Sequence, residues 1–298
     1  MRFSMDALPD VARIDARIHR GISAGLRRLA EHDDQRANRS LRRSPLAPLT
    51  GVVLAALVLA PVHGARAVNA NLNGSQDNTI YSETTPINRQ SNSNGAGHFI
   101  VAGRVGGPAV RRGLIEFDVA ASIPAGATIT SVTLTLRAGT PSNSSTSTDI
   151  SLFRLTQSWG EASTNAGEAV KSGGGAAAVD GDATWISRFH PGSPWSGGTF
   201  LTNPARATTS VSTNGDYSWS HSNMRADVQA WLDGTLANHG WLLKDGETTD
   251  GTVKWFHSKE HGTTTTRPKL TVVYTLPSDD DDFLTLIIQI LGAVASRP

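Results

Sequence analysis

The chain has 298 residues, with 27 lysines and arginines, 26 aspartates and glutamates, and no cysteine. Without cysteine, neither a disulfide scaffold nor a thiolate zinc site can form. Residues 1–67 hold 11 of the basic and 6 of the acidic residues, so the rest of the chain, with 16 basic and 20 acidic residues, is net negative. An acidic body lacks the positive surface that binds nucleic acids, and we expect no nucleic-acid partner.

A secretory signal is predicted near the beginning of the chain. Residues 46–62 are almost wholly apolar, basic residues precede them at 39–43, and Ala65-Arg66-Ala67 follows them. This order of a basic region, a short apolar region and an A-x-A site is typical of a signal peptide. We therefore assign residues 1–67 to an N-terminal extension and signal peptide and expect a secreted protein, extracellular or on the cell surface. The alternative is an N-terminal membrane anchor, for which the apolar run is short.

Two segments in the middle of the chain predict consecutive β-strands. Ile115, Phe117 and Val119 alternate with acidic residues, and residues 131–137 alternate between polar and apolar side chains. A period of two is typical of a half-buried strand, and Pro124-Ala125-Gly126 between the segments is a turn signal. Further strands are predicted at 77–81, 98–102, 150–155, 240–244, 252–257 and 269–274. A total of about eight to ten strands is too many for one open sheet and predicts two packed sheets.

One helix is predicted after residue 220. Ser222 can cap it, and Met224, Val228 and Trp231 follow the spacing of one helical face, with Gly234 as the stop. A single short helix in a β-rich chain is expected to cover an open end or edge of the sheets.

We expect one β-domain over residues 68–276. Within it, residues 160–215 have the least regular pattern, and the glycines at 173–175 lack the spacing of a phosphate-binding loop. Residues 277–298 form an acidic linker and a short apolar tail. The apolar part, 283–295, is too short for an ordinary membrane span, and its role is left open.

Catalytic motifs are weak in this sequence. Residues 257–261 match the inverted zinc-protease pattern H-x-x-E-H, but they continue a predicted strand, and the pattern needs a helix to bring both imidazoles to one metal. No G-x-S-x-G elbow is present. A glycosidase needs two carboxylates on either side of a sugar bond. The sequence does not pair its candidates, which are Glu116, Asp118, Glu161, Asp182 and Glu260. We expect no catalysis.

No cofactor is predicted, although a structural Ca²⁺ is left open. Asp77, or the turn residues Asp245, Glu247 and Asp250, would offer the oxygen ligands that calcium prefers. A plain turn is the simpler interpretation of each.

The aromatic content points to a binding surface. Seven tryptophans against three tyrosines is a high proportion for a glycine-rich β-domain, and the apolar face of a sugar ring can stack on indole. Trp185 and Trp195 lie in predicted loops, and Trp255 lies beside His257 and Lys259, so these three are predicted at the surface. Three tryptophans in regular patterns are predicted in the core: Trp159, Trp231 and Trp241.

Several motifs, taken together, resemble one known family. In chain order they are Arg-Arg-Gly-Leu-Ile-Glu-Phe-Asp-Val (111–119), Ile-Pro-Ala-Gly-Ala-Thr-Ile-Thr-Ser-Val-Thr-Leu-Thr-Leu (123–136), Ser-Trp-Gly-Glu (158–161), Asp-Val-Gln-Ala-Trp-Leu-Asp-Gly (227–234), Asn-His-Gly-Trp-Leu-Leu (238–243), Phe-His-Ser-Lys-Glu (256–260) and Arg-Pro-Lys-Leu-Thr-Val-Val-Tyr (267–274). Over residues 75–275 they resemble the DNRLRE domain, which overlaps the disaggregatase-related proteins and carbohydrate-binding module family 96.

The resemblance implies a secreted β-sandwich of jelly-roll type. Such domains often accompany polysaccharide-active enzymes, and some members bind an acidic polysaccharide such as alginate. We expect no catalytic domain within these residues, and no ligand residue is carried over from the family. Basic side chains near the motifs would suit an acidic glycan. The candidate carbohydrate-binding residues are therefore Trp185, Trp195, Trp255, His257, Lys259, Arg111 and Arg112.

We accordingly expect an all-β, two-sheet β-sandwich of jelly-roll type with one short capping helix. Its expected function is the non-catalytic binding of an extracellular or cell-wall polysaccharide. One alternative is a structural or adhesive surface protein that contacts protein partners. The other is a polysaccharide lyase or hydrolase.

Overall fold

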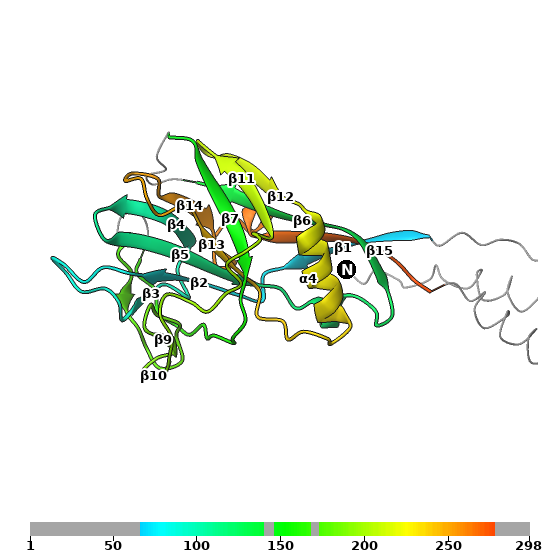
Figure 1. Cartoon of the computed structure of the whole chain (residues 1–298), viewed down its shortest axis with the longest axis horizontal. Helices are drawn as coiled ribbons and strands as arrows, with labels where there is room; N and C mark the ends of the chain where they lie inside the picture. The colour runs from blue at the N-terminus through cyan, green and yellow to red at the C-terminus, as the bar shows by residue number, and fades with distance from the viewer. Residues whose placement is uncertain (1–65, 140–145, 168–172, 278–298) are drawn as a thin grey trace, which may run out of the picture. The chain divides into compact units, whose positions relative to one another are not determined.

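The computed structural model describes residues 66–139, 146–167 and 173–277. The predicted signal peptide up to residue 65 and the acidic linker and tail from residue 278 lie outside these residues. The described part is mostly strand, with two α-helices, α3 (Val119–Ser122) and α4 (Ser222–Leu232), and a short 3-10 turn, η2 (Thr264–Thr266) (Figure 1). The predicted all-β sandwich is confirmed. No helix in these ranges is long and apolar enough to cross a membrane.

The strands of the described residues follow one another along the whole domain. They are β1 (Ala67–Asn73), β2 (Gln76–Tyr81), β3 (Asn92–Ser93), β4 (Phe99–Gly106), β5 (Ala109–Glu116), β6 (Thr128–Ala138), β7 (Thr148–Arg154), β8 (Ala176–Ala177), β9 (Ser187–Phe189), β10 (Gly192–Pro194), β11 (Ala207–Val211), β12 (Gly215–Trp219), β13 (Trp241–Lys244), β14 (Lys254–His257) and β15 (Lys269–Thr275).

Eleven of these strands build two antiparallel sheets that share one strand, and the pairs β3–β8 and β9–β10 form two small sheets of their own. Sheet A contains β1, β15, β6, β12 and β14, and sheet B contains β2, β5, β13, β7 and β11. Residues 99–102 of β4 pair with β14, whereas residues 103–106 pair with β5. The hydrogen-bonded path therefore passes from one sheet into the other through β4.

Gly103 marks the point where β4 changes partners. Its φ is +113°, and a Cβ at this position would lie 2.8 Å from the carbonyl oxygen of Thr252. Both the left-handed backbone and the close approach exclude a side chain, so glycine is required here.

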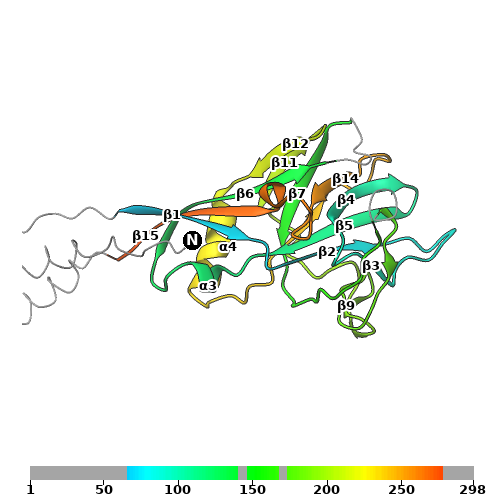
Figure 2. The same ribbon diagram turned by 180° about the vertical axis from the view of Figure 1, so that it is seen from behind.

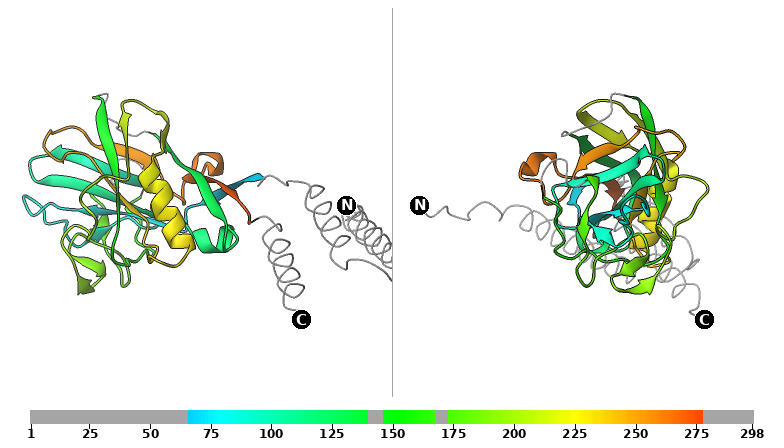
Figure 3. Two further views of the ribbon diagram at one scale, coloured as in Figure 1. Left: turned by 45° about the vertical axis from the view of Figure 1, so that its right-hand side comes forward. Right: turned by 90° about the vertical axis from the view of Figure 1, so that its left-hand side faces the viewer.

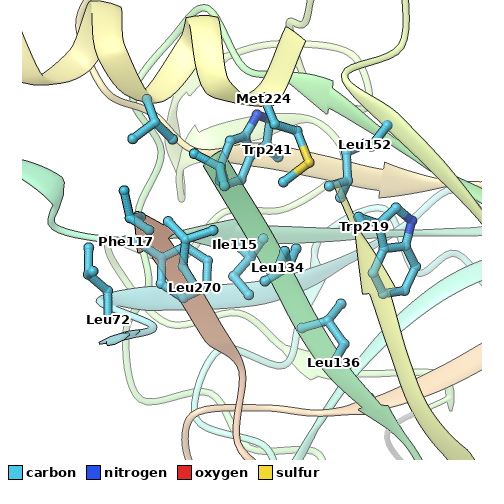
Figure 4. Close-up of a cluster of buried hydrophobic side chains, with 14 of the residues drawn as sticks. Leu72, Ile115, Phe117, Leu134, Leu136, Leu152, Trp219, Met224, Trp241 and Leu270 are labelled. Atoms are coloured by element: carbon cyan, nitrogen blue, oxygen red, sulfur yellow. The ribbon is translucent and has the colours of Figure 1, made fainter. Parts of the chain in front are cut away.

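The main core lies between the two sheets and beneath α4 (Figure 4). The two predicted central strands, β5 and β6, are not neighbours: β5 lies in sheet B and β6 in sheet A. Their apolar side chains nevertheless meet in this one core, Ile115 and Phe117 from one side and Leu134 and Leu136 from the other. The helix contributes Met224, Val228 and Trp231 to the same cluster.

Helix α4 covers the end of the sandwich, as predicted. It lies across the strands in Figures 1 and 3, with α3 beside it in Figure 2. The Gln229 side chain ties it to the start of β6 by accepting a hydrogen bond from the Ile129 amide at 2.7 Å and donating one to the Ala127 carbonyl at 3.1 Å. The cap residue was predicted one position too late: the His221 side chain, not that of Ser222, accepts from the Asn223 amide.

The elements that were not predicted from the sequence include β1, β11, β12 and α3, besides the short strands β3, β8, β9 and β10. Strand β1 pairs with β15 along its full length, although the first strand was expected at 77–81. Its side chains alternate well, but the segment adjoins the predicted cleavage site. Strands β11 and β12 fall in or beside the segment expected to be irregular; β11 is rich in Thr and Ser and lacks an apolar alternation, and β12 is short and begins with Gly215 and Asp216. Helix α3 is a single short turn capped by Asp118.

Candidate functional site

The irregular segment after β7 folds over the outer face of sheet B. A second hydrophobic cluster forms there from Ile80, Leu114 and Leu242 of the sheet and from Leu155, Trp159 and Ala183 of the segment. Trp159 is almost fully buried, as predicted, and its indole N–H donates to the carbonyl of His239 at 2.9 Å. Burial of large side chains therefore orders a segment that has little regular backbone pairing.

Trp185 and Trp195 stand at the two sides of the β9–β10 hairpin. The Trp195 amide donates to the Ile186 carbonyl at 3.1 Å, and the Gly197 amide donates to the Trp185 carbonyl at 2.7 Å. The indole N–H of Trp195 donates to the Thr184 carbonyl at 2.6 Å. Both rings are half-buried and pack against the second hydrophobic cluster. Local backbone bonds thus hold both indoles partly exposed on one face.

Arg112 lies over the ring of Trp185, with its guanidinium carbon 4.6 Å from the ring centroid. The guanidinium also binds both carboxylate oxygens of Glu247, at 2.7 and 2.8 Å, and donates to the Gly197 carbonyl at 2.6 Å. Burial by itself would raise the pKa of Glu247, but the hydrogen bonds and charge of Arg112, together with Lys244, lower it. The Arg112–Glu247 pair is therefore a fixed support for Trp185.

Phe153 and Phe200 extend this surface. Their ring centroids are 5.5 Å apart, Arg112 lies 5.4 Å from the centroid of Phe200, and the Lys244 ammonium lies 5.7 Å from that of Phe153. All are half-buried. We call this surface, whose aromatic and basic side chains come from β5, β7, β13 and the segment after β7, the aromatic–basic patch; it consists of Arg112, Phe153, Trp185, Trp195, Phe200 and Lys244.

A polar pocket of about 330 Å³ opens between the start of β7 and the connection 245–252. The same connection carries Glu247, so the pocket and the aromatic–basic patch share one structural support. Hydroxyl and carboxylate groups dominate its walls, among them those of Ser147, Thr148, Asp149, Asp245, Thr248 and Thr252. Asp245 accepts hydrogen bonds from the Glu247 amide at 2.9 Å and from the Thr252 hydroxyl, which shapes the connection.

The expected surface position of Trp255 is wrong. Its side chain is only 3% exposed and packs edge-to-face on Phe99, with ring centroids 5.7 Å apart. Strand β14 is paired on both sides, and Gly173 lies so close that a Cβ there would approach the indole to 3.0 Å. The outer face of the strand is therefore covered. His257, on the same face, is half-buried and also contacts Phe99.

Arg111 and Arg112 point to opposite faces of β5. Arg111 is 2% exposed, forms a salt bridge to Glu83 at 2.7 Å and donates to the Gly173 carbonyl at 2.6 Å. Its guanidinium also lies 4.9 Å from the ring centroid of Tyr81. Of the predicted binding residues, the fold therefore brings together Arg112, Trp185 and Trp195, and places the others elsewhere.

The candidate carboxylates separate into individual roles. Glu116 accepts from the side-chain amide of Gln76 at 2.8 Å, Asp118 caps α3, and Asp182 accepts from the backbone amide of Ala162 at 2.8 Å. Glu161 and Glu260 alone among them converge, both on the ammonium of Lys259.

The predicted calcium ligands of the 245–252 connection do not converge on one point. Asp245 is bound within the turn, Glu247 binds Arg112, and Asp250 binds Arg104 at 2.6 Å.

Sequence reasoning missed Phe153, Phe200 and Lys244. The period of two offered a signal for two of them: Phe153 alternates with the core residue Leu152, and Lys244 lies on the same face of β13 as Leu242. Phe200 has no such signal, because it lies in an irregular segment.

No protein-family model matches the chain, and a search of curated proteins finds no relative. The resemblance to the DNRLRE domain stays a prediction. What the geometry defines is a β-sandwich that presents an aromatic–basic patch beside a polar pocket.

Proposed function

We propose that the chain is a secreted, non-catalytic carbohydrate-binding module for an extracellular or cell-wall polysaccharide, with a preference for an acidic one. One observation carries the proposal. Four half-buried aromatic rings and two basic side chains gather on one outer face of sheet B, next to a pocket lined by hydroxyls and two carboxylates. Secretion rests on the predicted signal peptide.

Aromatic rings with a fixed orientation suit the recognition of sugars. The flat ring offers the apolar C–H face of a pyranose a large contact at little conformational cost. The hydrogen bonds around Trp185 and Trp195 hold both indoles in place before a ligand arrives, which lowers the entropic cost of binding.

The charge of the patch favours an acidic sugar. Arg112 and Lys244 share one carboxylate, that of Glu247, with distances of 2.7 and 3.5 Å. Two cations on one anion leave a net positive charge, which would attract a uronate carboxylate. Lys244 is the better contact for the uronate carboxylate, because the Arg112 guanidinium already donates to Glu247 and to the Gly197 carbonyl.

The pocket supplies partners for sugar hydroxyls. Its volume of about 330 Å³ lies at the lower end of small-molecule sites, which favours one monosaccharide unit. Threonine and serine hydroxyls can both donate and accept, so they suit the mixed donors and acceptors of a sugar ring.

Affinity electrophoresis of the chain through gels containing alginate, pectin, xylan or cellulose derivatives tests the proposal. We expect retardation by an acidic polysaccharide, weakened by salt. Trp185→Ala and Trp195→Ala should each weaken binding about tenfold or more, since they remove a central aromatic contact. Ile186→Ala is the matched control, because Ile186 is exposed, adjacent in sequence and outside the patch.

Two results would count against this function. If no polysaccharide retards the chain, the proposal that it binds carbohydrate is wrong. If both tryptophan variants are retarded as strongly as the wild type, the aromatic–basic patch is not the binding site. The release of reducing ends or unsaturated uronates from alginate or pectin would instead reveal a catalytic activity.

A further inference from the structure

Three carboxylates from distant parts of the chain, none of them in the aromatic–basic patch, meet at one point of the sandwich. Asp77 is the second residue of β2, Glu161 follows β7, and Glu260 follows β14. One carboxylate oxygen from each lies within 4.8 Å of the other two. No other group of potential metal ligands of this size converges in the described ranges.

Two oxygens of this acidic cluster are buried without a hydrogen-bond partner. Asp77 is 1% exposed: its Oδ2 accepts from the Lys259 amide at 2.7 Å, but its Oδ1 has no partner. The Oε2 atom of Glu260 is buried and unpartnered as well. Buried polar atoms in native proteins are nearly always satisfied, so two such oxygens in one cluster indicate a missing partner.

The charges of the cluster also do not balance. The ammonium of Lys259 lies 2.8 Å from Glu161 and also contacts Glu260. With all three carboxylates ionised, one ammonium would leave two negative charges in excess. Burial, followed by the charge of Glu260, raises the pKa of Asp77, and burial raises the pKa of Glu161 to about 7. Burial is the main cause of both pKa shifts, the charge of Glu260 adds to them, and Lys259 opposes them.

We propose that Asp77, Glu161 and Glu260 form a calcium-binding site that ties β2, the segment after β7 and the turn after β14 together. The ligand set is all oxygen, without imidazole or thiolate, which favours a hard cation over zinc. Calcium accepts irregular arrangements of carboxylates, whereas magnesium demands a near-octahedral set and keeps most of its waters.

The ligands are already held in position by the backbone. The amide of Asp77 donates to Glu161 at 3.1 Å, and the amide of Glu260 donates to the Ser258 hydroxyl at 3.2 Å. A Cβ at Gly95 would lie 2.9 Å from the Cγ of Glu161, so glycine leaves room for that side chain. Such prior positioning is what a metal site needs from its surroundings.

Lys259 acts as the competitor of the ion. Its side chain is 25% exposed, so the ammonium can swing into solvent as calcium enters. Because calcium carries two charges, it balances the cluster better than the ammonium does. Removal of the ammonium should therefore strengthen calcium binding, which a simple salt-bridge network would not do.

Calcium titration of the full chain, followed by calorimetry and by thermal unfolding after chelator treatment, tests the site. We expect Tm to rise on the order of 5 °C at about a hundredfold excess of calcium over its Kd. Asp77→Asn and Glu260→Gln should weaken binding about tenfold or more, and Lys259→Met should strengthen it by a similar factor. Asp180→Asn, at an exposed aspartate outside the cluster, should change nothing.

The proposal is overturned if neither the wild type nor Lys259→Met binds calcium. It is equally overturned if Lys259→Met only destabilises the fold, since the lysine would then be the permanent counter-ion. Should Asp77→Asn be unfolded in chelator, Glu260→Gln carries the test, because Glu260 is partly exposed. The site and the aromatic–basic patch share no residue, so retardation by polysaccharide and binding of calcium can each fail alone.

Discussion

The imidazole rings of His257 and His261 stack face to face, with centroids 3.5 Å apart and planes inclined by 12°. Thr266 bonds the Nδ1 atom of His257 at 2.7 Å, which holds that ring in the stack. Two stacked imidazoles cannot both carry a charge at low cost. Burial, and then the charge of His261, lower the pKa of His257 to about 4, with Arg137 adding to the shift and Asp216 opposing it.

The lowered pKa of His257 predicts a loss of stability in acid. An unfolded histidine has a pKa of about 6.5, so between about pH 6.5 and 4 the unfolded state binds a proton that the folded state does not. The contribution of His257 is therefore fully present above pH 6.5 and is lost as the pH falls toward 4. Denaturant unfolding at a series of pH values measures this slope, and His257→Asn should flatten it.

His221→Asn is the matched control for this measurement. His221 caps α4, and asparagine is an equally good cap, so the change removes a histidine without removing a structural role. We expect its pH slope to equal that of the wild type. An unchanged slope in His257→Asn would show that the stacked pair does not control acid stability.

We predict a large loss of stability when the side chain of Asp227, in α4, is truncated to alanine. It is 1% exposed, and its carboxylate accepts from Arg154 at 3.1 Å, Arg206 at 3.4 Å and the Trp241 indole at 3.0 Å. Asp227→Ala would leave Arg206, which is also buried, without its counter-charge. We expect a cost of about 3–5 kcal/mol in the free energy of unfolding, as for other buried pairs that lose one partner.

Asp216→Ala is the comparison for Asp227→Ala. Asp216 pairs with Arg137 at 3.5 Å, but both side chains are exposed, at 63% and 38%. Solvent screening should limit its cost to about 1 kcal/mol or less. Equal costs for the two variants, measured by chemical denaturation, would contradict the assigned role of the buried carboxylate.

Alanine variants of Gly240 and Gly234 distinguish the cost of backbone strain from the cost of a steric clash. Their φ angles are +69° and +67°, so alanine at either position strains the backbone equally. A Cβ at Gly240 would lie 2.0 Å from the carbonyl oxygen of Ile115, whereas nothing lies within 4 Å of one at Gly234. Gly234→Ala should cost about 1 kcal/mol. Gly240→Ala should cost about 3 kcal/mol or more, because β5 must also move.

Chemical denaturation of both glycine variants measures the difference. Similar losses for Gly240→Ala and Gly234→Ala would show that β5 yields to the added methyl group.

A covered outer face explains why Trp255 was wrongly predicted to lie at the surface. Trp241 and Trp255 both lie in short strands, and the sequence pattern around each is similar. Trp241 faces the main core, while Trp255 lies on the outer face of β14 against Phe99. The alternation of side chains shows that two faces exist, but not that a segment such as 173–175 covers the second one.

By itself, the sequence determined where most strands run, which side chains share a face, and that a helix begins near residue 222. These features depend on contacts between near neighbours, on the pleat of a strand and on the spacing of a helix, which the local sequence specifies. Only the tertiary structure decided that Arg112 meets Glu247 and that Asp77 joins Glu161 and Glu260. Each of these contacts joins residues far apart in the chain. Their side chains are brought together only by the packing of the two sheets and of the segment after β7.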